Sequence, residues 1–266
     1  MPIVYAILAL GGLGIVFGVV LSFADKVFAV PVDEKVALIR EAVAGANCGA
    51  CGYPGCDGFA EAVAKGEAPI TGCTPGGAKT LNALAEIMGM EAEAGDPLVA
   101  RVLCQGSTGI AKERVNYDGY QSCALANQLA GGPKMCQYAC MGLGDCKDAC
   151  MFGAIEMVDT IAVINEEKCT ACGMCVAACP RGIIKMWPRK ATVTVRCQNE
   201  GSAKEARESC SKGCIACKRC EKACEFDAIH VNNGFAAIDP AKCTLCEACV
   251  AVCPQKVGEP AWKSPW

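Results

Sequence analysis

Nine cysteines recur in this chain at a constant separation of 74 residues. The first set is Cys123, Cys136, Cys140, Cys146, Cys150, Cys169, Cys172, Cys175 and Cys179, and the second is Cys197, Cys210, Cys214, Cys220, Cys224, Cys243, Cys246, Cys249 and Cys253. Other residues agree as well, since Cys150-Met-Phe-Gly-Ala-Ile matches Cys224-Glu-Phe-Asp-Ala-Ile. Nine matches without a gap identify a tandem repeat, in which each unit is one structural module.

Each unit contains the run C-x2-C-x2-C-x3-C-P, once from Cys169 to Pro180 and once from Cys243 to Pro254. Bacterial two-cluster ferredoxins use this run to bind [4Fe–4S] clusters, and its fourth cysteine ligates the neighbouring cluster. The segments 155–164 and 229–238 read as short strands joined by a turn, which predicts a hairpin between the paired cluster motifs. The sequence therefore predicts two ferredoxin-like modules that move single electrons.

The spacing also predicts ligand sets. In the second unit they are Cys214, Cys217, Cys220 and Cys253 for one cluster, and Cys224, Cys243, Cys246 and Cys249 for the other. In the first unit, Cys150, Cys169, Cys172 and Cys175 form a complete set, whereas Cys140, Cys146 and Cys179 lack a fourth member because Leu143 stands where the second unit has Cys217. The candidates for the missing ligand are Cys104, Cys123 and Cys136, and Cys136 is the nearest in sequence.

A separate cluster module precedes the repeat. Cys48, Cys51, Cys56 and Cys73 have the spacing C-x2-C-x4-C-x16-C, within a glycine-rich stretch whose backbone can wrap closely around a cluster. We expect five [4Fe–4S] clusters in total. The remaining cysteines, Cys104, Cys123, Cys197 and Cys210 if Cys136 is the missing ligand, either bind a sixth cluster that bridges the two units or are buried thiols.

The segment from Ile3 to Phe23 has 21 residues and no charge, and a helix needs about 20 apolar residues to span a bilayer. The first basic residues, Lys26, Lys35 and Arg40, all follow it. Positive charge is enriched on the cytoplasmic side of membrane spans. We therefore expect one uncleaved anchor with the amino terminus outside and the cluster domains in the cytoplasm.

Other classes of function fit poorly. The 24 cysteines in 266 residues lie too close together for an ordinary disulfide framework, and zinc sites do not need four-cysteine runs followed by proline. The net charge of −3 argues against nucleic-acid binding. Neither a dinucleotide fingerprint nor a P-loop is present, so we expect no NAD or flavin on this chain. With the cysteine spacing, we also expect no zinc. Electron transfer through clusters needs no catalytic acid, base or nucleophile, and we expect none.

The predicted fold is α+β. It comprises a transmembrane helix (1–25), a small [4Fe–4S] domain (26–97) and two tandem two-cluster modules (98–190 and 191–266). This order of parts resembles the B subunit of the Rnf complex, the ferredoxin:NAD oxidoreductase of bacterial membranes, in its longer form with an extra tandem unit. The resemblance is strongest at residues 45–56, Gly-Ala-Asn-Cys-Gly-Ala-Cys-Gly-Tyr-Pro-Gly-Cys, and at the two complete ferredoxin runs.

The resemblance implies a component of the bacterial cytoplasmic membrane that takes electrons from reduced ferredoxin. It would pass them to membrane subunits that couple electron transfer to ion translocation, while NADH is bound elsewhere in the complex. The tandem clusters would be the entrance, and the cluster of Cys48 to Cys73, nearest the anchor, the exit. Two alternatives are a membrane-anchored polyferredoxin that reduces a redox sensor or metalloenzyme, and a zinc-stabilised scaffold.

Overall fold

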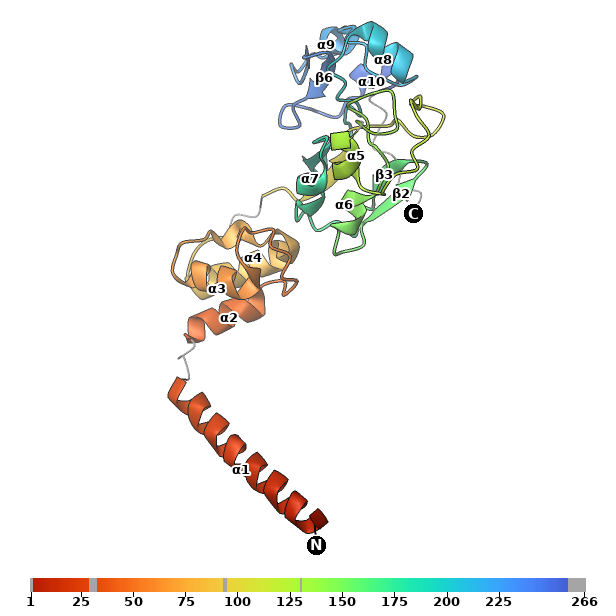
Figure 1. The fold of residues 1–266 in the computed structure, drawn as a ribbon. Helices are drawn as coiled ribbons and strands as arrows, with labels where there is room; N and C mark the ends of the chain where they lie inside the picture. Colours follow the sequence, from red (N-terminus) through yellow and green to blue (C-terminus); the bar gives the residue numbers. More distant parts are fainter. Residues whose placement is uncertain (1, 29–32, 93–94, 130, 258–266) are drawn as a thin grey trace.

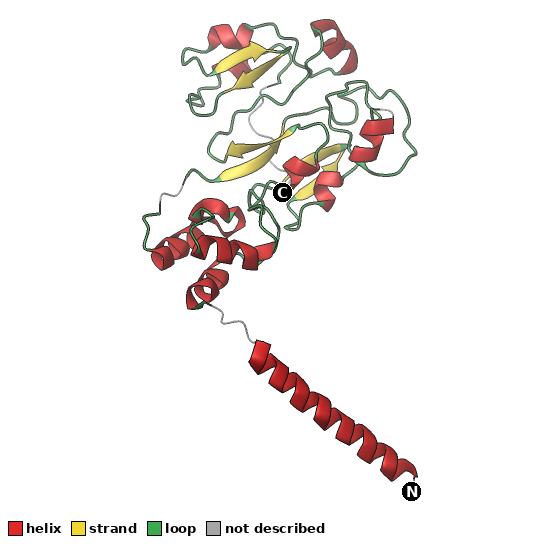
Figure 2. Ribbon diagram, turned by 60° about the vertical axis from the view of Figure 1, so that its left-hand side comes forward, coloured by secondary structure: helices red, strands yellow, loops and turns green. Residues whose placement is uncertain are grey.

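The computed structural model of the chain describes residues 2–28, 33–92, 95–129 and 131–257. Three parts follow one another in space: a long helix, a small helical domain, and a larger body that contains three two-stranded sheets (Figures 1 and 2). The cysteines lie in the second and third parts.

The long helix α1 runs from Pro2 to Phe28 and projects away from the rest of the chain (Figure 1). The structure describes its side chains at Tyr5 and at residues 10–24. Large apolar side chains there, including Leu13, Phe17 and Leu21, are exposed.

Within the described part of the chain, no helix is both long enough and apolar enough to cross a membrane.

The small domain is built from α2 (Glu34–Ala42), α3 (Gly55–Ala64) and α4 (Gly77–Met88), with the 3₁₀ turns η1 (Ile70–Gly72) and η2 (Thr74–Gly76) between the last two. Each helix contributes to one core, in which Ile39, Phe59 and Leu84 are fully buried. Asp33 caps α2 through a hydrogen bond from the backbone N–H of Lys35. The core holds in place the loop that carries Cys48 and Cys51 and the first turn of α3, which carries Cys56.

Two hairpins in the body confirm the strands predicted from the sequence. β2 (Ile155–Val158) pairs with β3 (Ile161–Ile164), and β5 (Ile229–Asn232) pairs with β6 (Phe235–Ile238), both antiparallel. The turn residues, Asp159 and Thr160 in one hairpin and Asn233 and Gly234 in the other, have positive φ. Two-residue turns of this kind match the natural twist of paired strands.

Short helices beside the cysteine runs also repeat: α6 (Asp145–Asp148) and α7 (Met174–Ala178) correspond to α9 (Arg219–Ala223) and α10 (Ala248–Ala251). The segments between the cluster motifs do not repeat. The first unit has α5 (Cys123–Leu129), whereas the second has α8 (Ala203–Ser209) at a different place in the repeat. The repeat therefore holds where cysteines and hairpins lie and breaks in the connecting chain.

A third sheet closes the first unit. β1 (Leu98–Val102) pairs antiparallel with β4 (Ile184–Pro188), so the two ends of the unit lie side by side. The units are also joined to each other, because Ala111 forms an isolated bridge with Cys210 and the backbone N–H of Lys112 donates to Ser209. Arg196 adds a hydrogen bond to the carbonyl of Cys104 at 3.2 Å. These contacts bring cysteines of both units to a common junction.

Candidate metal centres

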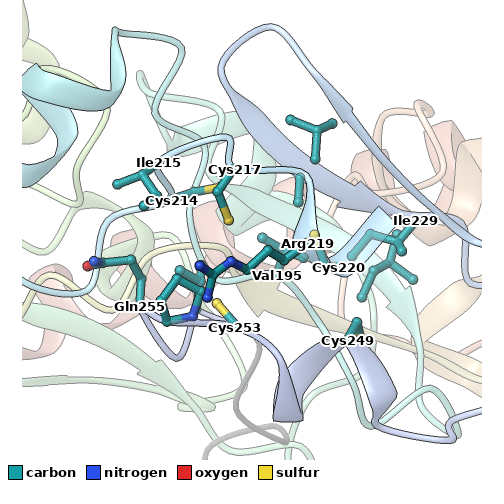
Figure 3. Close-up of a pocket in the computed structure, with 15 residues that line it drawn as sticks. Val195, Cys214, Ile215, Cys217, Arg219, Cys220, Ile229, Cys249, Cys253 and Gln255 are labelled. Carbon is teal, nitrogen blue, oxygen red and sulfur yellow. The ribbon is translucent and has the colours of Figure 1, made fainter. Parts of the chain in front are cut away.

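The best-formed candidate centre lies in the second unit. A hollow there is lined by five cysteines and by apolar side chains such as Val195, Ile229 and Val231. Four of the cysteines are Cys214, Cys217, Cys220 and Cys253, which we call the Cys220 group, and their side chains surround one space (Figure 3). The fifth is Cys249, which belongs to the other predicted set of this unit. The hairpin β5–β6 contributes to the apolar wall, and α9 carries Cys220. The structure thus brings together one of the sets predicted from spacing.

The other predicted set of the second unit is called the Cys249 group: Cys224, Cys243, Cys246 and Cys249. Burial raises the pKa of the Cys249 thiol, and the negative charges of its three partners in the group raise it further. The backbone N–H of Ala228 donates to the sulfur of Cys224 at 3.4 Å. Amide hydrogen bonds to sulfur are among the features that set the potential of an iron–sulfur cluster.

The first unit repeats this arrangement in the Cys175 group: Cys150, Cys169, Cys172 and Cys175. These four thiols line one hollow. Burial raises the pKa of Cys175 to about 12, with the other three thiols adding to the rise. The sulfurs of Cys150 and Cys169 accept hydrogen bonds from the N–H groups of Ala154 and Ala100, at 3.4 and 3.5 Å.

Next to the incomplete set of the first unit lies a cysteine other than the one expected. One hollow is lined by Cys123, Cys140, Cys146 and Cys179, which we call the Cys146 group. Burial raises the pKa of Cys146 to about 12, and Cys140, Cys123 and Cys179 are among the thiols that raise it further. The structure therefore places Cys123, and not the expected Cys136, next to the three other members.

Local hydrogen bonds explain this position of Cys123. Asp145, at the start of α6, accepts hydrogen bonds from the backbone N–H groups of Cys123 and Ala124 at 2.7 and 2.9 Å, and from the Ser122 hydroxyl at 3.1 Å. Cys146 follows Asp145 directly. The carboxylate thus holds the first turn of α5 against the group, while Leu143 packs near Cys123.

Four further cysteines meet where the two units join, and we call them the junction group: Cys104, Cys136, Cys197 and Cys210. Burial raises the pKa of Cys136, Cys197 and Cys210, and the negative charge of Cys104 raises all three further. For Cys197 the value is about 12. Cys136 thus lies in the group to which the sequence analysis assigned Cys123. The first unit contributes Cys104 and Cys136 to this group, and the second contributes Cys197 and Cys210.

The small-domain group consists of Cys48, Cys51, Cys56 and Cys73. Cys51, Cys56 and Cys73 pack against the domain core, and Cys48 is half-buried in the same loop. The N–H of Asn47 donates to the sulfur of Cys56 at 3.4 Å, and the Asn47 side chain accepts from the Cys56 N–H at 2.8 Å. At Gly55, φ is +80° and an added Cβ would lie 3.1 Å from the Asn47 side chain, so glycine allows this close loop.

The donor chemistry of these groups fits iron–sulfur clusters. All 24 cysteines are free thiols, and thiolates are the usual ligands of [4Fe–4S] clusters. Burial disfavours a lone thiolate, so cations must replace the protons when these thiols ionise. Within the described residues, no group of three or more Cys, His, Asp or Glu side chains is arranged to hold a metal ion. Three of the groups line the mainly apolar hollows described above.

Comparison with known proteins gives a consistent result. Three protein families match the chain: "Putative Fe-S cluster" at residues 44–75, "4Fe-4S binding domain" at 162–185 and "4Fe-4S dicluster domain" at 213–257. The chain is 47% identical over 246 residues to the B subunit of a Na(+)-translocating ferredoxin:NAD(+) oxidoreductase complex from Acetobacterium woodii, a match that covers 92% of this chain and 74% of that protein.

Two further relatives are similar along most of their length. The B subunit of an ion-translocating oxidoreductase complex from Methanosarcina acetivorans is 39% identical over 97% of this chain and 98% of its own. The B subunit of a proton-translocating ferredoxin:NAD(+) oxidoreductase complex from Clostridium ljungdahlii is 37% identical over 91% of this chain and 87% of its own.

Proposed function

The chain belongs to the family of B subunits of ion-translocating ferredoxin:NAD(+) oxidoreductase complexes, and we propose that it conducts electrons through six [4Fe–4S] clusters in such a complex. The observation that carries this proposal is the gathering of a four-cysteine set around each of three hollows in the tandem units, one of which Cys249 also lines. Each cluster, when bound, takes up and releases a single electron. The protein's own part is to hold, shield and order the ligand groups.

The six ligand sets are the groups defined above, with Cys123 in the Cys146 group and Cys136 in the junction group. The family matches support clusters in the small domain and in both units. Two observations support the junction group as a ligand set. Burial raises the pKa of Cys136, Cys197 and Cys210, and the negative charge of Cys104 raises the pKa of all three further. Five sets were expected from spacing. We infer the sixth because cysteines of both units meet at the junction.

We place the entrance for electrons in the second unit. Cys217 and Cys246 are the only exposed cysteines among the described residues. Lys218 and Arg219 follow Cys217 directly and are also exposed. Positive charge next to an accessible cluster ligand favours encounter with an acidic electron carrier. The names of two relatives refer to ferredoxin, and a reduced ferredoxin is the electron carrier that we propose for this surface.

The junction group provides a route between the units. The backbone N–H of Cys214, in the Cys220 group, donates to the sulfur of Cys197 at 3.3 Å. The N–H of Cys140, in the Cys146 group, donates to the sulfur of Cys104 at 3.5 Å. Direct hydrogen bonds thus connect the ligands of three groups in the order second unit, junction, first unit.

The small-domain group is the proposed exit, because its domain lies between the body and α1 (Figure 1). The apolar segment 3–23 and the exposed apolar side chains of α1 support a membrane anchor. Lys26, Lys35 and Arg40 support a cytoplasmic position for the cluster domains. Electrons would then leave toward membrane subunits of the complex, where ion translocation takes place.

Iron analysis combined with rapid kinetics tests the function. We expect about 24 irons per anaerobically purified chain, four for each cluster, and rapid loss of visible absorption when reduced ferredoxin is mixed with it. Stoichiometric zinc without iron, or iron clusters that reduced ferredoxin does not bleach, would contradict the proposal.

The variant Cys48→Ala tests the direction of the route. It should still be reduced by ferredoxin, because the distal groups are intact, but it should no longer pass electrons to the membrane subunits of the assembled complex. A variant that accepts no electrons at all would mean that the small domain is the entrance. Cys217→Ala is the matched comparison, since we expect it to slow reduction by ferredoxin.

A further inference from the structure

Lys134 is a lysine buried at the junction of the two units. Its side chain is 3% exposed, and its ammonium donates to the backbone carbonyls of Gly106 and Thr160, both at 2.6 Å. Among the described residues, no carboxylate lies within ion-pair distance of it. A buried charge is costly unless an opposite charge compensates for it, so this ammonium requires an anion that the protein side chains do not supply.

The two carbonyls place the ammonium next to two cysteine groups. On one side, the N–H of Gly106 donates to the sulfur of Cys104 in the junction group at 3.3 Å. On the other, Thr160 lies in the β2–β3 turn against Gly142, where an added Cβ would be 2.5 Å from the Thr160 carbonyl oxygen. Gly142 and Ala162 form backbone hydrogen bonds with Cys140 of the Cys146 group. Lys134 thus lies between Cys104 of the junction group and Cys140 of the Cys146 group.

The two groups next to Lys134 also touch each other. The backbone N–H of Cys140, in the Cys146 group, donates to the sulfur of Cys104, in the junction group, at 3.5 Å, so one ammonium lies close to both groups. The repeat contains no second copy of this feature, since the residue 74 positions later is Glu208, which is exposed.

We propose that Lys134 is a shared electrostatic partner of the clusters in the Cys146 and junction groups, and that it raises the reduction potential of both. The inference rests on the proposed function, because it requires clusters in these two groups. Thiolate-ligated clusters carry negative charge, and reduction adds more. A nearby fixed positive charge therefore stabilises the reduced form, and net charge is one of the factors that set cluster potentials.

A functional consequence follows for the route. In the described part of the chain, the Cys220 and Cys249 groups lack a buried lysine of this kind, and Arg219, which lines the Cys220 hollow, is exposed, so its charge is screened by solvent. The first electron acceptors in the second unit should therefore have lower potentials than the junction. Electrons would then move favourably from the second unit into the junction and the first unit. Because one charge serves two clusters, reduction of either one should also make reduction of the other more difficult.

Potentiometric titration of the full-length chain, followed by EPR and visible absorption, tests the proposal. Lys134→Gln keeps hydrogen-bond donors but removes the charge, whereas Lys134→Arg keeps the charge. We expect Lys134→Gln to retain the wild-type iron content and to shift two clusters to more negative potentials, with the others unchanged. Lys134→Arg should keep both potentials close to wild type. Lys147→Gln is the control, because Lys147 adjoins Cys146 but is exposed, and it should shift neither.

The remaining outcomes are also decisive. Loss of two clusters in Lys134→Gln but not in Lys134→Arg would support the proposal, because the charge would then be needed to hold the clusters. Unchanged potentials in Lys134→Gln at full iron content would overturn it. Equal shifts, or equal loss of iron, in both variants would also overturn it, because the hydrogen bonds rather than the charge would be responsible. Wild-type iron near five clusters with no junction cluster would instead reject the sixth site of the proposed function.

Discussion

At the scale of single residues, Asp145 has a large effect on the arrangement of ligands. Its carboxylate accepts hydrogen bonds from the N–H groups of Cys123 and Ala124 and from the hydroxyl of Ser122. Hydrogen bonds to a charged group contribute about 1.5–3 kcal/mol each. The second unit has Arg219 at this position, and it completes its group with Cys217 instead. Asp145 directly precedes Cys146 but lies 22 residues from Cys123 in the chain, so no local pattern in the sequence pointed to Cys123.

The exchange of Cys123 and Cys136 between groups predicts which double variants lose one cluster and which lose two. Cys104→Ser/Cys136→Ser removes two ligands of the junction group, so we expect a loss of about four irons, as in either single variant. Cys104→Ser/Cys123→Ser affects two groups and should lose about eight. Iron and acid-labile sulfide per chain provide the measurement.

The opposite pattern would support the assignment expected from spacing alone. In that case the Cys104/Cys123 pair would lose about four irons and the Cys104/Cys136 pair about eight. Either result would separate the two assignments without knowledge of the individual potentials. Cys175→Ser in the same backgrounds is a suitable control, because its group is the same in both assignments and its loss should be additive.

At the scale of elements, the hairpins and the short helices beside the cysteines are stable local units, whereas α8 depends on its cap. Ser202 accepts a hydrogen bond from the N–H of Glu205 at 3.2 Å, and the Glu205 carboxylate accepts one from the N–H of Ser202 at 2.7 Å. This reciprocal pair is a capping box. The helix ends at Ser209 and Cys210 follows it as the C-cap, so the stability of the helix affects the position of a proposed junction ligand.

We predict that Ser202→Ala destabilises α8 by about 1 kcal/mol, which corresponds to a roughly five-fold increase in hydrogen exchange of its amides. Lys204→Ala is the matched control on the same helix. Its exposed pair with Glu208 is of a kind that contributes about 0.3–0.5 kcal/mol. Equal effects of the two substitutions would show that the cap does not hold the helix.

The same cap makes the stability of α8 depend on pH. Hydrogen bonds from the backbone and side chain of Ser202 lower the pKa of Glu205 in the folded chain. The stabilisation is therefore fully present above the pKa of the unfolded state and is lost as the pH falls through the folded value. In Glu205→Gln this acid-dependent increase in α8 exchange should be absent, and its persistence would assign the pH effect to another group.

At the scale of the whole molecule, α1 and the cysteine-bearing domains are separate along the chain and in space (Figure 1). Exposed Leu13 and Val20 of α1 offer a direct test of the proposed anchor. Arginine at the centre of a membrane helix costs about 2.5–3.5 kcal/mol per residue on insertion scales. We predict that Leu13→Arg/Val20→Arg moves the separately expressed chain from the membrane fraction to the soluble fraction, with its iron content unchanged.

The control for this experiment is Leu38→Arg. Leu38 is also an exposed apolar side chain, but it lies on α2 outside the apolar segment. It should leave the chain in the membrane fraction. If the double variant stays with the membrane as firmly as wild type, α1 does not anchor the chain.

The local features of this protein were readable from the sequence because short spacings determine them. Cys169, Cys172 and Cys175 lie within one turn-and-helix segment, so the C-x2-C-x2-C spacing alone places them together. The hairpins followed from alternating apolar residues and turn residues, and their confirmed bounds differ by the repeat distance of 74. The family followed from the order of these local parts.

The fourth ligand of the Cys146 group and the membership of the junction group depended on tertiary structure. Cys104 and Cys197 come close because β1 pairs with β4 and because the two units pack against each other around Ala111 and Cys210. Neither contact has a local sequence pattern. For the Cys146 group, nearness in sequence favoured Cys136, whereas in the structure a hydrogen bond to the Asp145 carboxylate holds Cys123 in that place. Local spacing determines which cysteines lie together in each run, and long-range packing determines which cysteines from distant segments meet.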